Sequence, residues 1–143
     1  MRVYLDSCSF NRPFDDQGQL RIRLESEAKL EIQERIRAGR IELTWSYMMD
    51  FENSMNPFEE RRTRITAWRE LASVKVESDS SIVTRATEIQ ANGLKPKDSL
   101  HLACAERAAC DRFITTDDRM LKRRLLLAPM EIICPIDFVI EFP

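Results

Sequence analysis

The chain opens with Met1-Arg2-Val3-Tyr4-Leu5-Asp6-Ser7, a short apolar run that ends in an acid. The same pattern returns late in the chain, where Phe113-Ile114-Thr115-Thr116 leads directly to Asp117. Runs rich in aliphatic, β-branched and aromatic residues are typical of buried strands. Two predicted strands that each end in a carboxylate guide the interpretation of the rest of the sequence.

Most of the remaining chain has a helical pattern. Residues 19–38 place Leu20, Leu24, Ala28, Ile32 and Ile36 at four-residue steps, and Gly39 is suited to end that helix. The sequence further predicts strands at 41–45, 74–76 and 131–134, and helices at 46–56, 58–71, 79–92, 96–110 and 118–127. We expect a turn-rich connector at 11–16.

Short strands that alternate with helices predict an α/β fold, a three-layer α/β/α sandwich with a central, mostly parallel sheet. A length of 143 residues is enough for one domain, 1–143, with a substantial core. In such sheets, ligands bind outside the carboxyl ends of the strands. This rule brings Asp6 and Asp117 to the same edge of the sheet.

Two further acids are candidates for the same edge. Asp98 opens an apolar helix, where a solvated acid that favours the helix dipole is the alternative interpretation. Glu52 follows Met48 and Phe51, which we expect to form a buried stripe with Met55, and a solvated helix acid is again the alternative. Asp6 could likewise be a simple turn or cap residue.

The doublet Asp117-Asp118 leaves one ambiguity, because neighbouring side chains rarely enter one pocket together. We expect Asp117 to point into the site and Asp118 to cap the next helix. Carboxylates that converge repel one another unless a cation lies between them. Asp6, Glu52, Asp98 and Asp117 therefore predict a site for a hard divalent cation, Mg²⁺ or Mn²⁺.

Other chemistries find less support. His101 is the only histidine, and we expect a helix residue with a satisfied ring rather than a general base. Ser7, Ser9 and Thr115 could orient a carboxylate. The four cysteines form no metal-binding spacing and predict small buried side chains in a reducing cytoplasm. The first residues contain no apolar signal segment, and no apolar tract is long enough to span a membrane.

Net charge is −2, so any nucleic-acid contact must come from local patches. Basic residues gather in two helical segments, although solvated faces with acidic partners are an equally good interpretation. The segments hold Arg61, Arg62, Arg64 and Arg69, and Arg119, Lys122, Arg123 and Arg124.

At these residues the chain resembles the PIN domain family, and within it the toxin nucleases of VapBC type. The resemblance rests on Val3-Tyr4-Leu5-Asp6-Ser7, the acid of Ser46-Tyr47-Met48-Met49-Asp50-Phe51-Glu52, the stretch Lys97-Asp98-Ser99-Leu100-His101-Leu102-Ala103, and Phe113-Ile114-Thr115-Thr116-Asp117. It implies a Mg²⁺- or Mn²⁺-dependent endoribonuclease with Asp6, Glu52, Asp98 and Asp117 as catalytic, metal-binding acids. A hydroxyl beside the site would be Ser7 or Thr115.

The resemblance also implies an RNA substrate, a homodimer and an antitoxin protein that holds the enzyme inactive. We expect direct metal contact from Asp6 and Asp98, with Glu52 and Asp117 at a second ion or acting through water. Two departures from the family pattern are the segment 11–16 after the first acid and the doublet Asp117-Asp118.

Two rival functions remain open. The same fold could serve as a non-catalytic module that binds RNA or a protein, with structural acids. A phosphatase or phosphoacceptor domain also places an aspartate after its first strand, but it needs a second acid close to the first and a late lysine. The only acids near Asp6 are Asp15 and Asp16, in the predicted turn.

Overall fold

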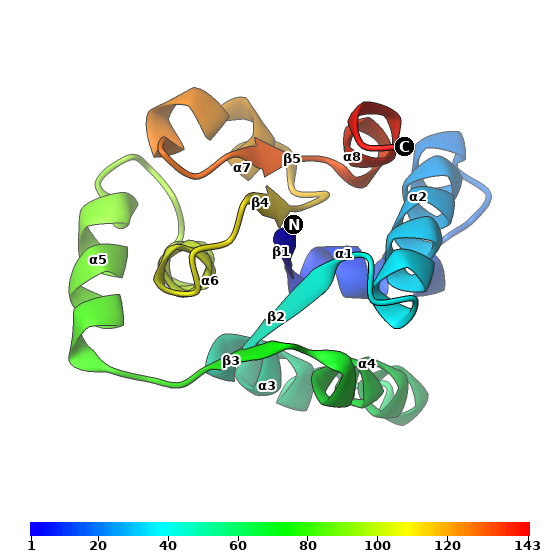
Figure 1. Ribbon diagram of the computed structural model, residues 1–143, viewed down its shortest axis with the longest axis horizontal. Coiled ribbons are helices and arrows are strands. Elements are labelled where there is room, and N and C mark those ends of the chain that lie inside the picture. Colours follow the sequence, from blue (N-terminus) through cyan, green and yellow to red (C-terminus); the bar gives the residue numbers. More distant parts are fainter.

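A five-stranded sheet, in which every pairing is parallel, forms the centre of the computed structural model, which describes residues 1–143. The strand order is β3-β2-β1-β4-β5 (Figure 1). The strands are β1 (Arg2–Leu5), β2 (Glu42–Ser46), β3 (Val74–Val76), β4 (Arg112–Ile114) and β5 (Ile132–Ile133). The predicted parallel sheet is therefore confirmed.

The direction of the winding reverses at β1. The chain proceeds from β1 through β2 to β3 on one side, and then returns to place β4 and β5 on the other side. β1 and β4 are hydrogen-bonded neighbours, with Leu5 opposite Ile114. In a sheet wound this way, the ligand crevice lies beyond the carboxyl ends of the strands at the point of reversal.

Helices cover both faces of the sheet, which confirms the three-layer sandwich. In Figure 1, α1, α2, α4 and α8 lie to the right of the sheet, and α5 and α6 to the left. The helices are α1 (Ser7–Asn11), α2 (Leu20–Arg37), α3 (Tyr47–Ser54), α4 (Glu59–Leu71), α5 (Ser80–Gln90), α6 (Pro96–Arg107), α7 (Asp118–Lys122) and α8 (Pro135–Glu141). Two short 3-10 helices, η1 (Arg12–Phe14) and η2 (Arg124–Leu127), complete the fold.

Local sequence signals set several helix ends as expected. The Ser46 hydroxyl accepts a hydrogen bond from the amide of Met49 and caps α3. Gly39 and Gly93 follow α2 and α5 with φ of 70° and 88°, a conformation that glycine adopts without strain. No helix of the structure combines the length and the apolar character needed to cross a bilayer.

The segment after β1 is helical, not a connector. α1 begins directly after Asp6, and η1 follows it, so the turn predicted at 11–16 is wrong for most of its length. The reason is local. Asp6 accepts a hydrogen bond from the amide of Ser9, and this cap starts α1, which extends to Asn11. Arg12–Phe14 then form one 3-10 turn with Pro13 near its start, where the missing N–H of proline is tolerated.

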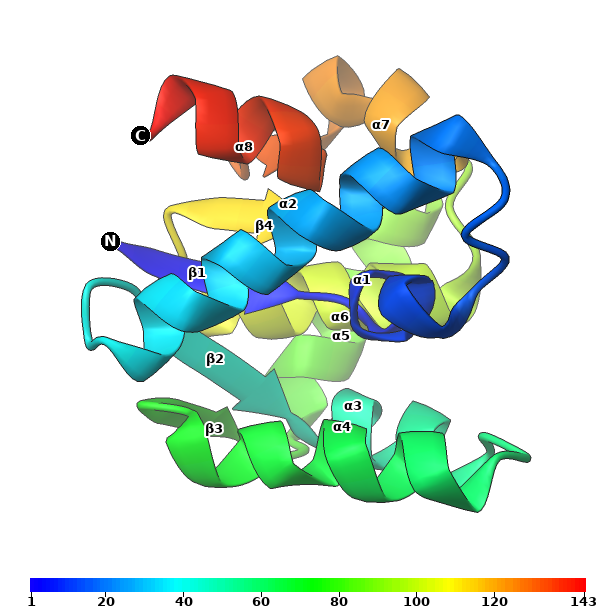
Figure 2. The ribbon, with the colours of Figure 1, turned by 90° about the vertical axis from the view of Figure 1, so that its right-hand side faces the viewer.

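The buried faces of two helices also differ from expectation. On α3, Met48 and Met49 are buried, whereas Phe51 and Met55 are exposed. On α2, Ala28, Ile32 and Ile36 are buried, but Leu20 and Leu24 are exposed because the first turns extend beyond the sheet (Figure 2). α6 is central as predicted, and Leu102, Cys104 and Ala105 are completely buried.

Candidate active site

Asp6 and Asp117 follow the two strands at the point where the winding reverses. Asp6 comes directly after β1 and caps α1, and its amide donates to the carbonyl of Ile114 at 3.3 Å. Asp117 lies just beyond β4 and caps α7. The fold thus brings both acids to one edge of the sheet, as the strand pattern predicted.

The Asp6 carboxylate is held from two sides. Asp6 is only 5% exposed, and its Oδ1 accepts from the Ser9 amide at 2.9 Å. Its Oδ2 accepts from the hydroxyl of Thr115, which in turn accepts from the Asp117 amide at 3.0 Å. Burial raises the pKa of Asp6 to about 6, in spite of these hydrogen bonds.

Glu52 on α3 is tied to both neighbouring helices. Its Oε2 accepts from the Ser7 hydroxyl of α1, and its Oε1 lies 2.9 Å from Nε2 of His101 on α6. Burial alone would raise the pKa of Glu52, but the bond and charge of His101 and the bond of Ser7 outweigh it. The pKa of Glu52 is therefore lowered, and this carboxylate stays ionised.

A buried chain of hydrogen bonds fixes the histidine. The Tyr4 hydroxyl lies 2.6 Å from Nδ1 of His101 and 2.6 Å from the hydroxyl of Ser46. Tyr4 therefore links Ser46 to His101, and Nε2 of His101 donates to Glu52, because an ionised carboxylate only accepts. The ring is satisfied as expected, and it also positions an acid.

All four acids act on one neighbourhood. Cys8 of α1 is exposed, contrary to the expectation of buried cysteines, and the pKa of its thiol is raised first by the charge of Asp6 and also by the charges of Asp117, Glu52 and Asp98. The pKa of Asp98 is raised by burial and by the charges of Asp117 and Glu52. Acids from four separate segments of the chain therefore lie near Cys8, and two of them, Asp117 and Glu52, repel the charge of Asp98.

This donor set fits a hard divalent cation in its chemistry. The candidate ligands are carboxylate oxygens, and the Asp98 carboxylate forms no hydrogen bond or ion pair. The charges of His101 and Lys95 offset only part of the effect of burial and of the neighbouring acids on its pKa. A cation would relieve the repulsion that raises its pKa. No group of three or more His, Cys, Asp or Glu side chains is placed so that it could hold a metal ion, so the four acids lie near one another here without forming a metal-binding set.

Asp118 lies outside this neighbourhood. It is exposed and forms a two-pronged ion pair with Arg21 of α2, at 2.6 and 3.0 Å. Asp117, not Asp118, is the N-cap of α7 and accepts from the amide of Arg119. The expectation that Asp118 caps this helix is wrong, because the extended backbone at Asp117 directs the earlier carboxylate to the helix start.

The profile of the PIN domain matches residues 3–125, which include all four acids and most of the chain. The chain belongs to the PIN domain family. Its fold is similar to that in the crystal structure of FitAcB from Neisseria gonorrhoeae, with a TM-score of 0.58 and 11% identity over 93% of this chain and 97% of that chain. A comparison with curated protein sequences gives no match.

Basic residues border the acids of this PIN domain. Lys97 lowers the pKa of Glu52 through its charge, and Lys95 does the same for Asp98, although neither is the main influence. On α7 and in the turn that follows it, Arg119 and Lys122 are exposed and form no ion pair. By contrast, Arg64 of α4 is paired with Glu60 at 3.0 Å.

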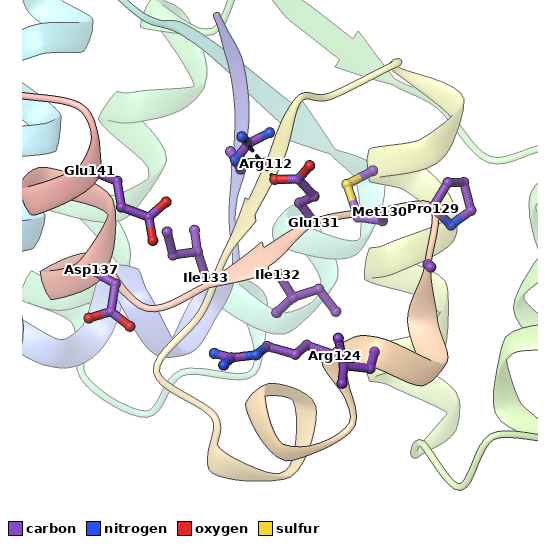
Figure 3. Close-up of a pocket in the computed structure, with 11 residues that line it drawn as sticks. Arg112, Arg124, Pro129, Met130, Glu131, Ile132, Ile133, Asp137 and Glu141 are labelled. Atoms are coloured by element: carbon purple, nitrogen blue, oxygen red, sulfur yellow. Dashed lines mark ion pairs between the residues drawn. The ribbon is translucent and has the colours of Figure 1, made fainter.

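A cavity of about 350 Å³ beside β5 lies apart from the acids (Figure 3). Arg124 extends beneath Ile132 and Ile133 there, and Arg112 pairs with Glu131 at 2.8 Å. None of the four acids lines this cavity. The candidate active site of this PIN domain, at the ends of β1 and β4, is therefore separate from this cavity.

Two members of the site were not assigned roles from the sequence. The sequence predicts Tyr4 only as a strand residue and His101 only as a helix residue with a satisfied ring. The available signal was the spacing of Asp98 and His101, one turn apart on a helix. The sequence does not reveal the hydrogen-bond partners of His101, because Tyr4, Glu52 and His101 come from three distant segments.

Proposed function

We propose that this PIN domain is a divalent-metal-dependent endoribonuclease that hydrolyses RNA phosphodiester bonds. The observation that carries the proposal is the position of four carboxylates from separate segments around Cys8, just after β1 where the winding of the sheet reverses, since the charges of all four raise the pKa of its thiol. We infer Asp6, Glu52, Asp98 and Asp117 as its catalytic, metal-binding residues.

Each acid has a distinct task in this proposal. Glu52, kept ionised by Ser7 and His101, and Asp6, oriented by Thr115 and the Ser9 amide, present fixed carboxylates. Asp98, in the first turn of α6, and Asp117, the N-cap of α7, add further negative charge. Mg²⁺ or Mn²⁺ bound there would polarise the phosphoryl oxygens and lower the pKa of an attacking water.

The chain's basic residues provide the hold on the substrate. Lys95 and Lys97 precede Asp98, and their charges act on Asp98 and Glu52. Arg119 and Lys122 follow Asp117 in the sequence. Such residues attract phosphates regardless of base sequence. RNA as the substrate rests on the resemblance to VapBC-type toxins and not on a base-reading group.

The wider biological role follows from the same resemblance. We infer that the protein is the toxin of a type II toxin–antitoxin pair, acts in the cytoplasm, forms a homodimer, and is inhibited by an antitoxin protein. The fold shared with FitAcB supports this role at the level of architecture. Co-purification with the product of the adjacent gene would test it.

A cleavage assay tests the enzymatic proposal. Purified protein is incubated with a fluorescently labelled single-stranded RNA in Mn²⁺, in Mg²⁺ and in EDTA. We expect cleavage with either metal, none in EDTA, and a loss of at least a hundredfold in Asp98→Asn. Asp118→Asn is the matched control, because the neighbouring acid is exposed and paired with Arg21, and it should cleave like the wild type.

The second candidate is a non-catalytic module that binds RNA or a protein. This candidate is favoured by the absence of any group of three or more His, Cys, Asp or Glu side chains that could hold a metal ion. In that case the wild type cleaves at no metal concentration, and Asp98→Asn binds RNA as well as the wild type. RNA cleavage that persists unchanged in Asp98→Asn would contradict the enzymatic proposal directly.

A further inference from the structure

A second cavity, of about 580 Å³, lies between α2 and α4. α1 lies between these helices (Figure 2). Phe10 of α1 and Trp68 of α4 form part of the cavity wall. Its volume falls in the usual range for small-molecule sites, about 300–1,000 Å³. None of the four acids lines it, so it is separate from the candidate active site.

Lys29 of α2 lies in this cavity without a counter-charge. The residue is 4% exposed, and its Nζ lies 5.2 Å from the ring centre of Phe10 and 5.8 Å from that of Trp68. It forms no ion pair or hydrogen bond, and burial with the nearby charge of Arg37 lowers its pKa to about 7. A buried ammonium is costly unless an anion joins it.

Gln33 stands one helical turn from Lys29, on the same face of α2. It is 3% exposed, and its side-chain amide nitrogen is buried with no hydrogen-bond partner. Buried polar atoms of native proteins are almost always paired, so an unpaired one calls for a partner. Two unpaired donors on successive turns of α2 therefore line one cavity.

We propose that the cavity between α2 and α4 binds a small carboxylic acid that carries an apolar or aromatic body. The two oxygens of one carboxylate match the two free donors, Lys29 and Gln33. Phe10 and Trp68 provide an apolar wall for the body. The other cationic side chains of the wall, Arg37 and Arg64, are already paired with Glu34 and Glu60, so the site offers one free charge and favours a monoanion.

The ligand is tested first with the unmodified protein. 3-Phenylpropionate is titrated into ¹⁵N-labelled protein and followed by NMR. We expect saturable shifts of amides on α2 and α4, and binding at least tenfold weaker for 3-phenylpropionamide, which has the same shape but no charge. Inorganic phosphate should produce no saturable shift at these amides.

Variants then locate the site. Lys29→Met keeps the length of the side chain and removes its charge, and it should weaken binding of 3-phenylpropionate at least tenfold. Gln33→Leu should also weaken it and serves as a second variant that leaves the charge in place. Lys75→Met, the same change at an exposed lysine on β3, should bind like the wild type.

Three outcomes would overturn the proposal. They are equal binding of the acid and its amide, wild-type binding by Lys29→Met, and no saturable shift in the wild type. Because binding is measured without RNA or metal, each outcome is independent of the proposed nuclease activity.

Discussion

Nε2 of His101 lies 2.9 Å from Oε1 of Glu52, which joins α6 to α3 through a histidine whose other nitrogen, Nδ1, is hydrogen-bonded to the Tyr4 hydroxyl. Glu52, an acid of the candidate site, is therefore held in place by His101, which is only 2% exposed. His101→Leu would remove one of the two hydrogen-bond partners of the buried Tyr4 hydroxyl and would leave Glu52 without its histidine partner. We expect the free energy of unfolding to fall by about 1–3 kcal/mol, measured by urea denaturation.

The pH dependence gives the same prediction a second readout. The folded-state pKa of Glu52 is lowered, so its contribution to stability is present above the unfolded pKa and is lost as pH falls through the folded value. In His101→Leu, the free energy of unfolding should therefore fall less as the pH is lowered. Tyr4→Phe, which removes the hydroxyl but leaves the His101–Glu52 bond, should retain the wild-type fall. An unchanged acid-side profile in His101→Leu would contradict the assigned role of His101.

The buried, ionised carboxylate of Asp6 should lower the free energy of unfolding at neutral pH. Burial raises its folded-state pKa to about 6, above the ordinary value of 3.8, so the folded protein holds the proton more strongly. Stability from this group is present at low pH and falls as pH rises from about 4 to 6. In EDTA at pH 7, Asp6→Asn should therefore unfold at higher urea, with a gain of about 1–3 kcal/mol.

The same change should abolish RNA cleavage, so stability and activity move in opposite directions. At pH 4 the stability gain should be much smaller, because the wild-type carboxyl is then protonated. Asp16→Asn, at an exposed acid in the loop before α2, is the matched control and should alter neither property. A less stable Asp6→Asn at pH 7 would contradict the burial argument.

Lys29 should limit stability below neutral pH. Its folded-state pKa is lowered to about 7 from 10.5, so the full cost of burying the charge applies below pH 7 and is relieved as pH rises toward 10.5. Lys29→Met should raise the free energy of unfolding by about 2–4 kcal/mol at pH 6. The gain should decline above pH 7, whereas Lys75→Met should show no such trend in the same urea titrations.

The basic residues after Asp117 should set the salt dependence of RNA binding. Arg119 and Lys122 are exposed and unpaired, so each is free to neutralise one phosphate. In Arg119→Ala/Lys122→Ala, the slope of log affinity against log salt concentration should fall by about 1.4, since each phosphate contact with a single strand adds about 0.7.

Arg64→Ala provides the comparison, because Arg64 is already paired with Glu60. It should leave the slope unchanged. Binding is measured by fluorescence anisotropy with Asp98→Asn in all proteins, which prevents cleavage. Equal slopes for all three proteins would exclude α7 from the RNA surface.

Much of this fold was predictable from local patterns. Short continuous apolar runs predict β1 and β4, and the structure confirms both strands. Capping residues such as Ser46 and Asp79 predict helix starts that the structure also confirms. The fold rule for parallel sheets placed Asp6 and Asp117 at one edge because it depends only on strand direction.

The features that were missed depend on tertiary contacts. Phe51 and Met55 have the spacing of a buried stripe, but the orientation of α3 against the sheet buries Met49 instead. The pairing of Asp118 with Arg21 joins residues far apart in the chain, and no local pattern encodes it. The same holds for the link between His101 and Glu52.

The most direct test of the central claim is a calorimetric titration of metal-free protein with Mn²⁺. If the four acids gather to hold a cation, the wild type should take up Mn²⁺ saturably, Asp98→Asn should bind at least tenfold more weakly, and Asp118→Asn should bind like the wild type. Absence of Mn²⁺ uptake by the wild type, or undiminished uptake by Asp98→Asn, would contradict the claim.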